Sequence, residues 1–386
     1  MRRETAIALV ALLAACGSRG EPATGAGQVP PAGFVTQAVP GGVLVLPEGF
    51  VASVFAEGMG DVRLMAIGPA GDVYASQSSE GRIVRLPDRD RDGTADEVAT
   101  VVDGLNDPHG LAFRSDTLYV AENHRVVRFD RQGAAPVVVV PNLPSDGGHH
   151  TRTLLVHGDH LYVSVGSSCN ICDERDRRRA AVVRYNLDGS GETLFATGLR
   201  NAVGLAVNPE TGEIWVTNND RDNLGDDVPP DRVNILREGG FYGWPQCYLP
   251  GRNNPEYADY RGCSAVIGPA VTLPAHVAPL GLAFYTGTMF PEGYRGNLFI
   301  ALHGSWNRSV PVGYEVVRVD VENGKPVGQW RQFISGWLAG PVRGLGYGVG
   351  DAWGRPVDVL VTPDGALLIS DDQGRRIYRV AYGGGT

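Results

Sequence analysis

The stretch GLAVNPETGEIWVT (204–217) decides the fold of this chain. It reads as an apolar strand, a polar turn and a second strand rich in β-branched and aromatic residues. The same strand-turn-strand phrase occurs six times in the 386 residues. In chain order the copies are MAIGPAGDVYAS (65–76), GLAFRSDTLYVA (110–121), TLLVHGDHLYVS (153–164), GLAVNPETGEIWVT (204–217), GLAFYTGTMFPEGYRGNLFIA (281–301) and VDVLVTPDGALLIS (357–370).

Several copies are followed by a closing strand such as RIVRL (82–86), RVVRF (125–129) or RIYRV (376–380). The copies start roughly 40 to 75 residues apart, which is typical of propeller blades with inserted loops. A β-sandwich would not repeat one phrase six times, and a doubly wound α/β fold would need long amphipathic helices that the sequence lacks. We therefore predict an all-β fold, a six-bladed β-propeller over residues 41–386. Loops from several blades should supply one site at a mouth of the ring.

Composition indicates a large β-type core and a small-molecule partner. Hydrophobic residues make up 43% of the chain, and its 53 glycines and 26 prolines indicate many turns. The formal net charge of -9 argues against nucleic-acid binding, which needs clustered lysine and arginine.

The first residues read as an export signal, with Arg2 and Arg3 before an apolar run that ends at Ala15. Residues 13–16, LAAC, resemble a bacterial lipobox, which implies a signal peptide over 1–15 and lipidation of Cys16. An ordinary secretory signal with a chance cysteine is the alternative. Because Asp is absent after the cysteine, the segment resembles lipoproteins of the outer membrane, so we expect a periplasmic protein held to that membrane by its lipid alone. Residues 16–40, rich in Gly, Pro and Ala, are predicted to be a flexible tether.

Four cysteines remain after Cys16, an even number in a compartment that permits disulfides. Cys247 and Cys263 would close a short loop. Cys169 and Cys172 form a CxxC, but no second CxxC completes a tetrahedral zinc site. We predict two structural disulfides and leave the CxxC pairing open. No CxxCH for haem attachment is present in the sequence.

Candidate chemical residues cluster just before or after predicted strands. GGHHTRT (147–153) puts His149 and His150 ahead of the third copy, at a channel mouth. GLRN (198–201) leads into the fourth copy, which is followed by a loop of Asn and Asp and then by YGWP (242–245).

This order of motifs resembles the soluble quinoprotein glucose and sorbosone dehydrogenases. GHHTRT, YVSVGSSCN, APLGLAFY and HGSWNRSVPVGYEVVRV look like the sorbosone dehydrogenase branch, and the resemblance runs from about Leu46 to Ala381. It implies oxidation of an aldose, a sorbosone-like aldehyde or a related sugar with pyrroloquinoline quinone and calcium.

The resemblance also implies roles for single residues. His149 matches the general base, a role that suits imidazole because its pKa lies near working pH; His150 ranks second. Arg200 and Asn201 match the pair placed against the cofactor. Asp220 and Arg221 match the loop whose main-chain carbonyls bind calcium, although the Gly-Pro turn of the glucose enzymes is absent here.

The three carboxylates of the cofactor call for a basic cluster. Arg308 and Arg355 lie at the mouths of the last two blades and are predicted to supply it, with Val357 where the family has a further arginine. Four aromatic residues are candidates either for stacking on a planar ring or for core packing: Trp306, Trp244, Tyr242 and Trp353.

The acidic run DRDRDGTADE (88–97) is a second candidate calcium site. Its carboxylates Asp88, Asp90, Asp92 and Asp96 follow the first half of an EF-hand loop. Position twelve falls on Ala99, and a solvated hairpin is the alternative. We assign this run no catalytic role.

Two other functions stay open at this stage. A calcium-dependent propeller lactonase or other hydrolase would share the ring and the metal but use an acidic ligand set open to water. A non-catalytic binding propeller would share only the fold. Tight binding of pyrroloquinoline quinone separates the dehydrogenase from both.

Overall fold

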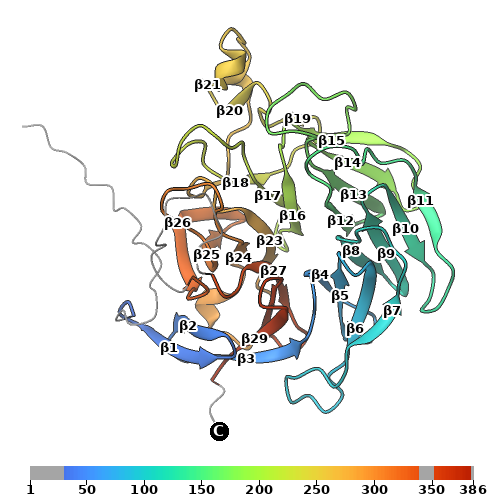
Figure 1. Cartoon of the computed structure of the whole chain (residues 1–386), viewed down its shortest axis with the longest axis vertical. Coiled ribbons are helices and arrows are strands. Elements are labelled where there is room, and N and C mark those ends of the chain that lie inside the picture. The colour runs from blue at the N-terminus through green and yellow to red at the C-terminus, as the bar shows by residue number, and fades with distance from the viewer. Residues whose placement is uncertain (1–29, 339–351, 384–386) are drawn as a thin grey trace, which may run out of the picture.

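The computed structural model describes residues 30–338 and 352–383. Six β-sheets are arranged around a common axis (Figure 1), which confirms the predicted all-β, six-bladed propeller. Cys16 and the predicted signal peptide lie outside the described residues. Within the two described ranges, no helix is long and apolar enough to cross a membrane.

The first three blades follow one another along the chain, each antiparallel from its inner strand outward. Blade one contains β4 (Val62–Ile67), β5 (Val73–Gln77), β6 (Arg82–Leu86) and β7 (Ala99–Val102). Blade two contains β8 (Leu111–Arg114), β9 (Thr117–Glu122), β10 (Arg125–Phe129) and β11 (Val137–Val140). Blade three contains β12 (Arg152–His157), β13 (His160–Val165), β14 (Ala181–Asn186) and β15 (Thr193–Thr197), extended by the parallel strand β19 (Gly240–Phe241).

Blades four and five carry the longer insertions. Blade four contains β16 (Ala202–Val207), β17 (Ile214–Asn218), β18 (Arg232–Ile235) and β22 (Val271–Thr272). Blade five contains β23 (Pro279–Phe284), β24 (Leu298–Leu302), β25 (Glu315–Glu322) and β26 (Lys325–Ile334). Between β18 and β22 of blade four the chain forms the small hairpin β20 (Cys247–Leu249) and β21 (Arg252–Asn253) and the 3-10 turns η1 (Pro255–Tyr257) and η2 (Cys263–Ala265), while η3 (Glu292–Tyr294) lies within blade five.

The sixth blade joins the two ends of the folded chain. From the axis outward, its first three strands are β27 (Pro356–Val361), β28 (Leu367–Asp371) and β29 (Arg376–Tyr382). The outermost strand, β3 (Phe50–Glu57), comes from near the N-terminus and pairs antiparallel with β29. Hydrogen bonds between the first and last strands of the ring therefore hold it closed.

The predicted tether is too long at its C-terminal end. Residues Phe34–Val39 form strand β1, which pairs in full register with β2 (Gly42–Pro47). The side chain of Gln37 also accepts a hydrogen bond from the main-chain N–H of Ala52 at 2.9 Å. These contacts order the segment against the sixth blade, so the folded part begins before residue 41.

Close packing of the inner strands explains the glycines in the repeated phrase. Where the six inner strands converge on the axis, the backbone of one strand meets the next. A Cβ at Gly204 would lie 2.2 Å from the carbonyl oxygen of Leu280, and a Cβ at Gly110 would lie 2.4 Å from the amide nitrogen of Leu154. Glycine is therefore required at these positions because no side chain fits between the strands.

The core lies between the blades. One cluster packs Trp215 of blade four against Leu282, Phe284 and Ile300 of blade five, and each of these side chains is buried. The middle strands are apolar on both faces because each sheet lies between two others. The ring is thus a set of face-to-face sheet interfaces, which leaves the strand ends and loops free to build a site.

Candidate active site

A cavity of about 320 Å³ opens at the end of the ring where the inner strands begin. Antiparallel pairing brings the start of each inner strand next to the end of the second strand, so both contribute side chains there. Blades one, three, four, five and six supply the wall. The residues that line it are Arg63, His149, Arg200, Asn201, Asn219, Asp220, Asp222, Asp231, His276, Ala278, Leu280, His303, Trp306, Asn307 and Arg355.

His149 lies in this cavity, just before β12. Its contacts with Ser167 determine which ring nitrogen carries the proton. Its Nδ1 is 2.9 Å from the carbonyl oxygen of Ser167 and 3.0 Å from the Ser167 hydroxyl. A carbonyl oxygen only accepts hydrogen bonds, so Nδ1 carries the proton and Nε2 carries the lone pair. Burial and the positive charge of Arg200 lower the pKa of His149 to about 3. The imidazole is therefore neutral at physiological pH and can accept a proton at Nε2.

Two buried arginines hold the backbone of His149. Arg152 Nη1 donates to the His149 carbonyl at 3.0 Å, and Arg179 Nη1 donates to the same oxygen at 3.1 Å. Arg179 also pairs with Asp146 at 3.1 Å. Gly166 lets the ring lie close, because a Cβ there would come within 2.6 Å of the His149 Cβ. His149 is thus braced from several sides.

His150, ranked second as a base, lies outside the residues that line the cavity. Its side chain is half exposed, and its Nδ1 is 3.1 Å from a carboxylate oxygen of Asp107. The two adjacent histidines therefore point to different environments, which the sequence alone does not distinguish.

Arg200 and Asn201 also line the cavity. Arg200 donates four of its five N–H groups to other residues of the protein. Two hydrogen bonds go to Asn170, one to its main-chain oxygen and one to its Oδ1. The other two go to the Asp220 carbonyl and the Asp222 carboxylate. One N–H on Nη1 remains for a bound group. Burial lowers the pKa of Arg200, while Asp222 and Asp220 oppose that shift.

The predicted calcium loop lies directly beside Arg200. The main-chain carbonyl of Asp220 accepts a hydrogen bond from Arg200 Nη1 at 2.7 Å, which leaves its second lone pair. The Asp220 carboxylate forms a buried ion pair with Arg232, and the side chain of Arg221 pairs with Glu256 at 2.5 Å. Among the described residues, the cavity wall offers no cluster of three side chains already grouped as metal ligands. An ion here would depend on main-chain oxygens and on a ligand.

A basic cluster that includes the predicted residue Arg355 lies around His303, which was not predicted from the sequence. His303 Nε2 is 3.0 Å from both carboxylate oxygens of Asp372, and Arg63 pairs with the same carboxylate. Arg355 donates from Nε and Nη2 to the carbonyls of His303 and Gly304, at 2.9 and 2.8 Å. Burial lowers the pKa of His303 to about 4. Arg355 is where the sequence predicted it, and Arg63 joins it from the first blade.

His276 and Asn307 complete the wall on the blade-five side. His276 Nε2 donates to the carbonyl of Gly225 at 2.9 Å, so its Nδ1 is the acceptor that faces Asn307 at 3.4 Å. The Asn307 amide donates to Asp222 at 2.7 Å, while its Oδ1 is buried without a hydrogen-bond partner. An acceptor in this condition at a cavity wall suits a donor on a bound molecule.

Arg308 is not among the residues that line the cavity. Its guanidinium donates to the carbonyls of Asp226 and Ala275 and pairs with Asp227 at 3.0 Å. The prediction that it belongs to the basic cluster is therefore not supported by its position. The loop after β24 turns Trp306 and Asn307 toward the cavity instead.

The four aromatic candidates divide clearly. Trp306 lines the cavity and is 51% exposed. Trp244 and Tyr242 are buried, and their polar atoms bind main-chain carbonyls of Asn170 and Ile235. Trp353 packs against Trp337. Only Trp306 of the four has an aromatic face available at the mouth.

The second candidate calcium site is partly assembled. Asp88, Asp90 and Asp92 each offer a carboxylate oxygen within 4.8 Å of the others. Asp96 instead accepts a hydrogen bond from the main-chain N–H of Arg89 at 2.8 Å. The same aspartates also accept turn hydrogen bonds, such as that from Gly93 to Asp88 at 3.0 Å. Calcium binding here stays a prediction.

Both predicted disulfides are present. Cys247 pairs with Cys263, and Cys169 pairs with Cys172, which decides the pairing left open from the sequence. The Cys247–Cys263 disulfide closes the insertion that contains β20 and β21. The Cys169–Cys172 disulfide lies in the loop after β13.

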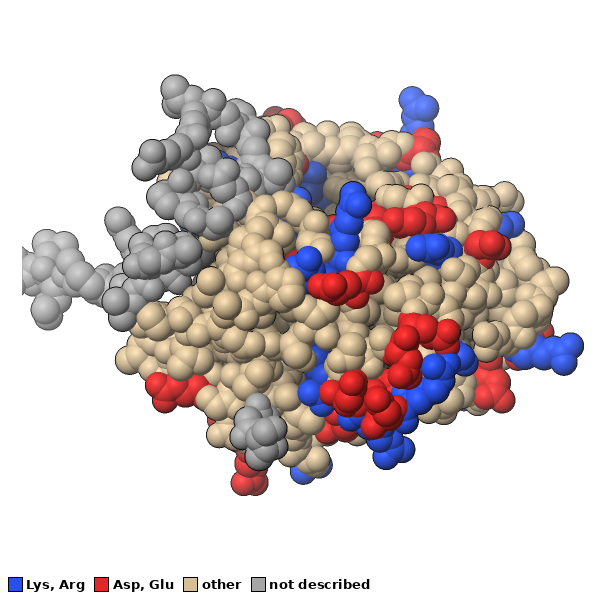
Figure 2. All heavy atoms as spheres, turned by 60° about the horizontal axis from the view of Figure 1, so that its bottom comes forward, with Lys and Arg blue, Asp and Glu red and all other residues tan. Residues whose placement is uncertain are grey.

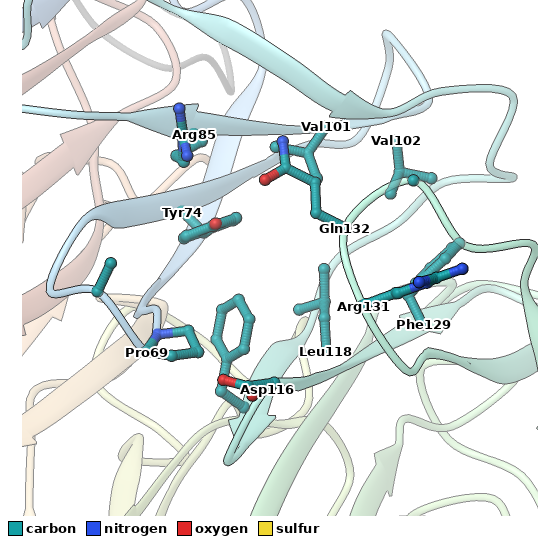
Figure 3. Close-up of a pocket in the computed structure, with 13 residues that line it drawn as sticks. Pro69, Tyr74, Arg85, Val101, Val102, Asp116, Leu118, Phe129, Arg131 and Gln132 are labelled. Atoms are coloured by element: carbon teal, nitrogen blue, oxygen red, sulfur yellow. The ribbon is translucent and has the colours of Figure 1, made fainter.

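A second cavity, of about 310 Å³, lies between blades one and two. Figure 3 shows Tyr74, Leu118, Val101 and Arg131 around it. Its wall contains no histidine and one carboxylate, Asp116, so it lacks a candidate base like His149. On the face drawn in Figure 2, the basic side chains of the described residues are interspersed with acidic ones and form no continuous basic patch.

Comparison with known proteins places this fold and site in context. The family model described as TrAA12-like matches residues 44–254 and 251–382. An uncharacterized protein of Borreliella burgdorferi is 32% identical over 308 residues, covering 74% of this chain and 78% of that protein. A pyrroloquinoline quinone-dependent sugar dehydrogenase of Hypocrea jecorina is 27% identical over 324 residues, covering 68% and 73%.

Solved structures agree on the fold. The holo form of the pyranose dehydrogenase PQQ domain from Coprinopsis cinerea has a TM-score of 0.75 at 22% identity, covering 88% of this chain and 97% of that one. The calcium structure of a Trichoderma reesei family AA12 enzyme has a TM-score of 0.74 at 23% identity, with the same coverage.

Proposed function

Because the chain belongs to the TrAA12-like family and is similar to a pyrroloquinoline quinone-dependent sugar dehydrogenase, we propose that it oxidises a sugar with that cofactor. The observation that carries the proposal is that a partly buried, neutral His149 and a cluster of arginines line the same cavity. An aldose or a sorbosone-like aldehyde is the proposed substrate, and a separate carrier is the proposed electron acceptor.

The donors of the cavity fit the cofactor. A planar molecule with three carboxylates and a quinone needs cations and N–H donors around its rim. Arg63 and Arg355 provide two guanidinium groups, and Arg200 provides the one N–H left on Nη1. Arg63 is proposed to supply the positive charge that the sequence lacks at Val357. The exposed face of Trp306 suits stacking on a planar ring.

His149 is proposed as the general base. When bound, the quinone supplies a hydride acceptor for the carbon that loses its hydrogen. The Nε2 lone pair of His149 takes the proton of the substrate hydroxyl. A pKa of about 3 makes a weak base, but carboxylates bound in the cavity would raise that pKa toward neutrality. Ser167 keeps the proton on Nδ1, and the opposite nitrogen therefore stays available.

Calcium is proposed at the main-chain carbonyls of Asp220 and Arg221. The supporting observations are the free lone pair of the Asp220 carbonyl and the acidic residues Asp222 and Asp231 on the same wall. Calcium accepts mixed carbonyl and ligand oxygens in loose geometry. The hydrolase alternative is less well supported, because both Asp231 oxygens accept main-chain N–H groups and Asp222 binds Arg200 and Asn307.

We further propose a periplasmic location with attachment to the outer membrane through lipidated Cys16. This proposal rests on residues 1–17 of the sequence alone.

The test uses the protein without residues 1–15, supplied with calcium and pyrroloquinoline quinone. Cofactor binding is measured by quenching of tryptophan fluorescence, and turnover by reduction of an artificial dye with aldoses, sorbosone and simple alcohols. We expect saturable binding and sugar-dependent dye reduction that requires the cofactor. The controls omit the cofactor or add a calcium chelator. Absence of cofactor binding would overturn the proposal, and hydrolysis of lactones with calcium alone would favour a hydrolase.

A further inference from the structure

The Cys169–Cys172 disulfide lies behind the cavity wall, and neither cysteine lines the cavity. The residues next to the sulfurs nevertheless contact the groups that do line it. Ser167 lies two residues before Cys169 and contacts His149, and Asn170 lies between the cysteines and contacts Arg200. One short loop therefore touches the proposed base and a proposed cofactor contact, which are 51 positions apart in the sequence.

The first arm of this loop acts on His149. The Ser167 carbonyl accepts from both the main-chain N–H and the Nδ1–H of His149, at 3.1 and 2.9 Å. The Ser167 hydroxyl donates to the carbonyl of Cys169 at 2.7 Å, so its oxygen faces the His149 Nδ1–H as an acceptor. The position of the Cys169 carbonyl therefore decides the orientation of the Ser167 hydroxyl, and through it the ring of His149.

The second arm acts on Arg200. The Asn170 carbonyl accepts from Arg200 Nε and from the Trp244 indole N–H, both at 3.1 Å. Its side-chain oxygen accepts from Arg200 Nη2 at 3.0 Å and from the Asp222 main-chain N–H at 2.8 Å. Its side-chain amide donates to the Asp222 carbonyl at 3.2 Å. Asn170 thus makes five hydrogen bonds, two with Arg200, two with Asp222 in the proposed calcium loop of blade four and one with Trp244.

The small size of the disulfide ring argues for a local role. A cross-link restricts the unfolded chain more when it closes a longer loop. Cys169 and Cys172 are three positions apart, whereas Cys247 and Cys263 are 16 apart. The shorter ring contributes less to global stability by this effect. It lies in a segment without helix or strand between β13 and β14, where no ladder of hydrogen bonds holds the chain.

We propose that the Cys169–Cys172 disulfide is a positioning element of the active site, which holds Ser167 against His149 and Asn170 against Arg200. The inference rests on the proposed function, because it assigns the loop a role in that reaction. Ser167 and Asn170 are positioning residues, since they act through His149 and Arg200. A rigid support of this kind keeps reacting groups in place where a loop alone would let them move.

The test compares two double variants of the full folded domain. Cys169→Ser with Cys172→Ser opens the proposed positioning ring, and Cys247→Ser with Cys263→Ser is the control that opens the longer ring, whose cysteines do not flank Ser167 or Asn170. The first readout needs no cofactor: hydrogen–deuterium exchange at the imidazole C2 carbon of each histidine, followed against pH by mass spectrometry. We expect His149 to exchange faster and its pKa to rise toward the ordinary histidine value in the first variant only. Arg200, Arg179, Arg152 and His150 are the charged or titratable groups around it, and all four remain in both variants.

The second readout uses calcium and the cofactor. We expect kcat/KM to fall about 10- to 100-fold in the first variant, because small displacements of reacting groups have effects of this size. In Asn170→Ala, which retains the disulfide, we expect weaker cofactor binding with the wild-type exchange of His149. Wild-type exchange of His149 in the Cys169/Cys172 variant would overturn the inference. Equal acceleration at His303, in blade five, would also overturn it, because the effect would then be global. A wild-type protein that binds no cofactor would instead refute the proposed function.

Discussion

The two ends of the six inner strands differ in chemistry although they belong to the same strands. Where the strands begin, the cavity wall holds arginines, histidines and aspartates from five blades. Further along the same strands, a cavity of about 390 Å³ is lined mostly by apolar residues such as Leu64, Leu111, Leu205 and Leu282. The apolar end follows the repeat blade by blade. The polar end is built from positions where each blade departs from the repeat, so the repeat makes the ring and the departures make the site.

Among the variants considered, His149→Ala at the polar end should have the largest effect. We expect kcat/KM to fall by roughly 10²- to 10⁴-fold, because the variant lacks the proposed proton acceptor. Cofactor affinity and the midpoint of thermal unfolding should change little. The measurement is dye reduction under saturating cofactor, with His150→Ala as the matched control. A comparable loss in His150→Ala would move the base to the neighbouring histidine.

At the apolar end, Leu282→Ala should affect stability alone. The side chain is buried between blades four and five, and its truncation should lower the free energy of unfolding by about 2–5 kcal/mol. Urea unfolding measures this loss. The folded fraction should retain the wild-type kcat/KM, and a fall in that value would mean that the two ends are coupled.

Arg63→Gln tests the proposed cofactor contact at the polar end. Loss of a charged hydrogen bond to a carboxylate should weaken cofactor binding roughly 10- to 100-fold, while glutamine can still donate to Asp372. Arg308→Gln is the control, because its guanidinium binds Asp226, Asp227 and Ala275. Fluorescence titration with pyrroloquinoline quinone measures both. Equal losses in the two variants would contradict the cluster assigned here.

The apolar end contains one carboxyl group, Asp358, which should give stability a pH dependence. Burial raises its pKa to about 7 from 3.8. Between these values the folded protein holds the proton and the unfolded chain does not, so raising the pH disfavours folding. Between pH 5 and pH 7, the free energy of unfolding of Asp358→Asn minus that of the wild type should therefore increase by up to about 1.4 kcal/mol per pH unit. Denaturant melts at several pH values test this. In Asp188→Asn, an exposed control whose pKa is lowered by Ser190, the difference should stay flat in the same window.

Much of the candidate site was predictable because its residues lie next to recognisable strands. His149, Arg200, Asn201, Asp220 and Arg355 were all singled out from the sequence, and all five line one cavity. Arg63, His276 and Asn307 were missed because no local motif marks them. Arg308 was misplaced because a loop can turn either of two adjacent side chains, here Asn307 or Arg308, toward the cavity.

The sequence by itself determined the six-bladed ring, since a repeat of apolar strands and turns has one way to bury all its faces. It also predicted that Cys169, Cys172, Cys247 and Cys263 would form two disulfides. Only the tertiary structure decided which groups meet at the mouth. Arg63 and Asp372 lie 309 positions apart and pair across the first and sixth blades, where β3 and β29 close the ring. The physical reason is that strand formation depends on neighbours in sequence, whereas a site at the axis depends on which loops the closed ring brings within hydrogen-bond distance.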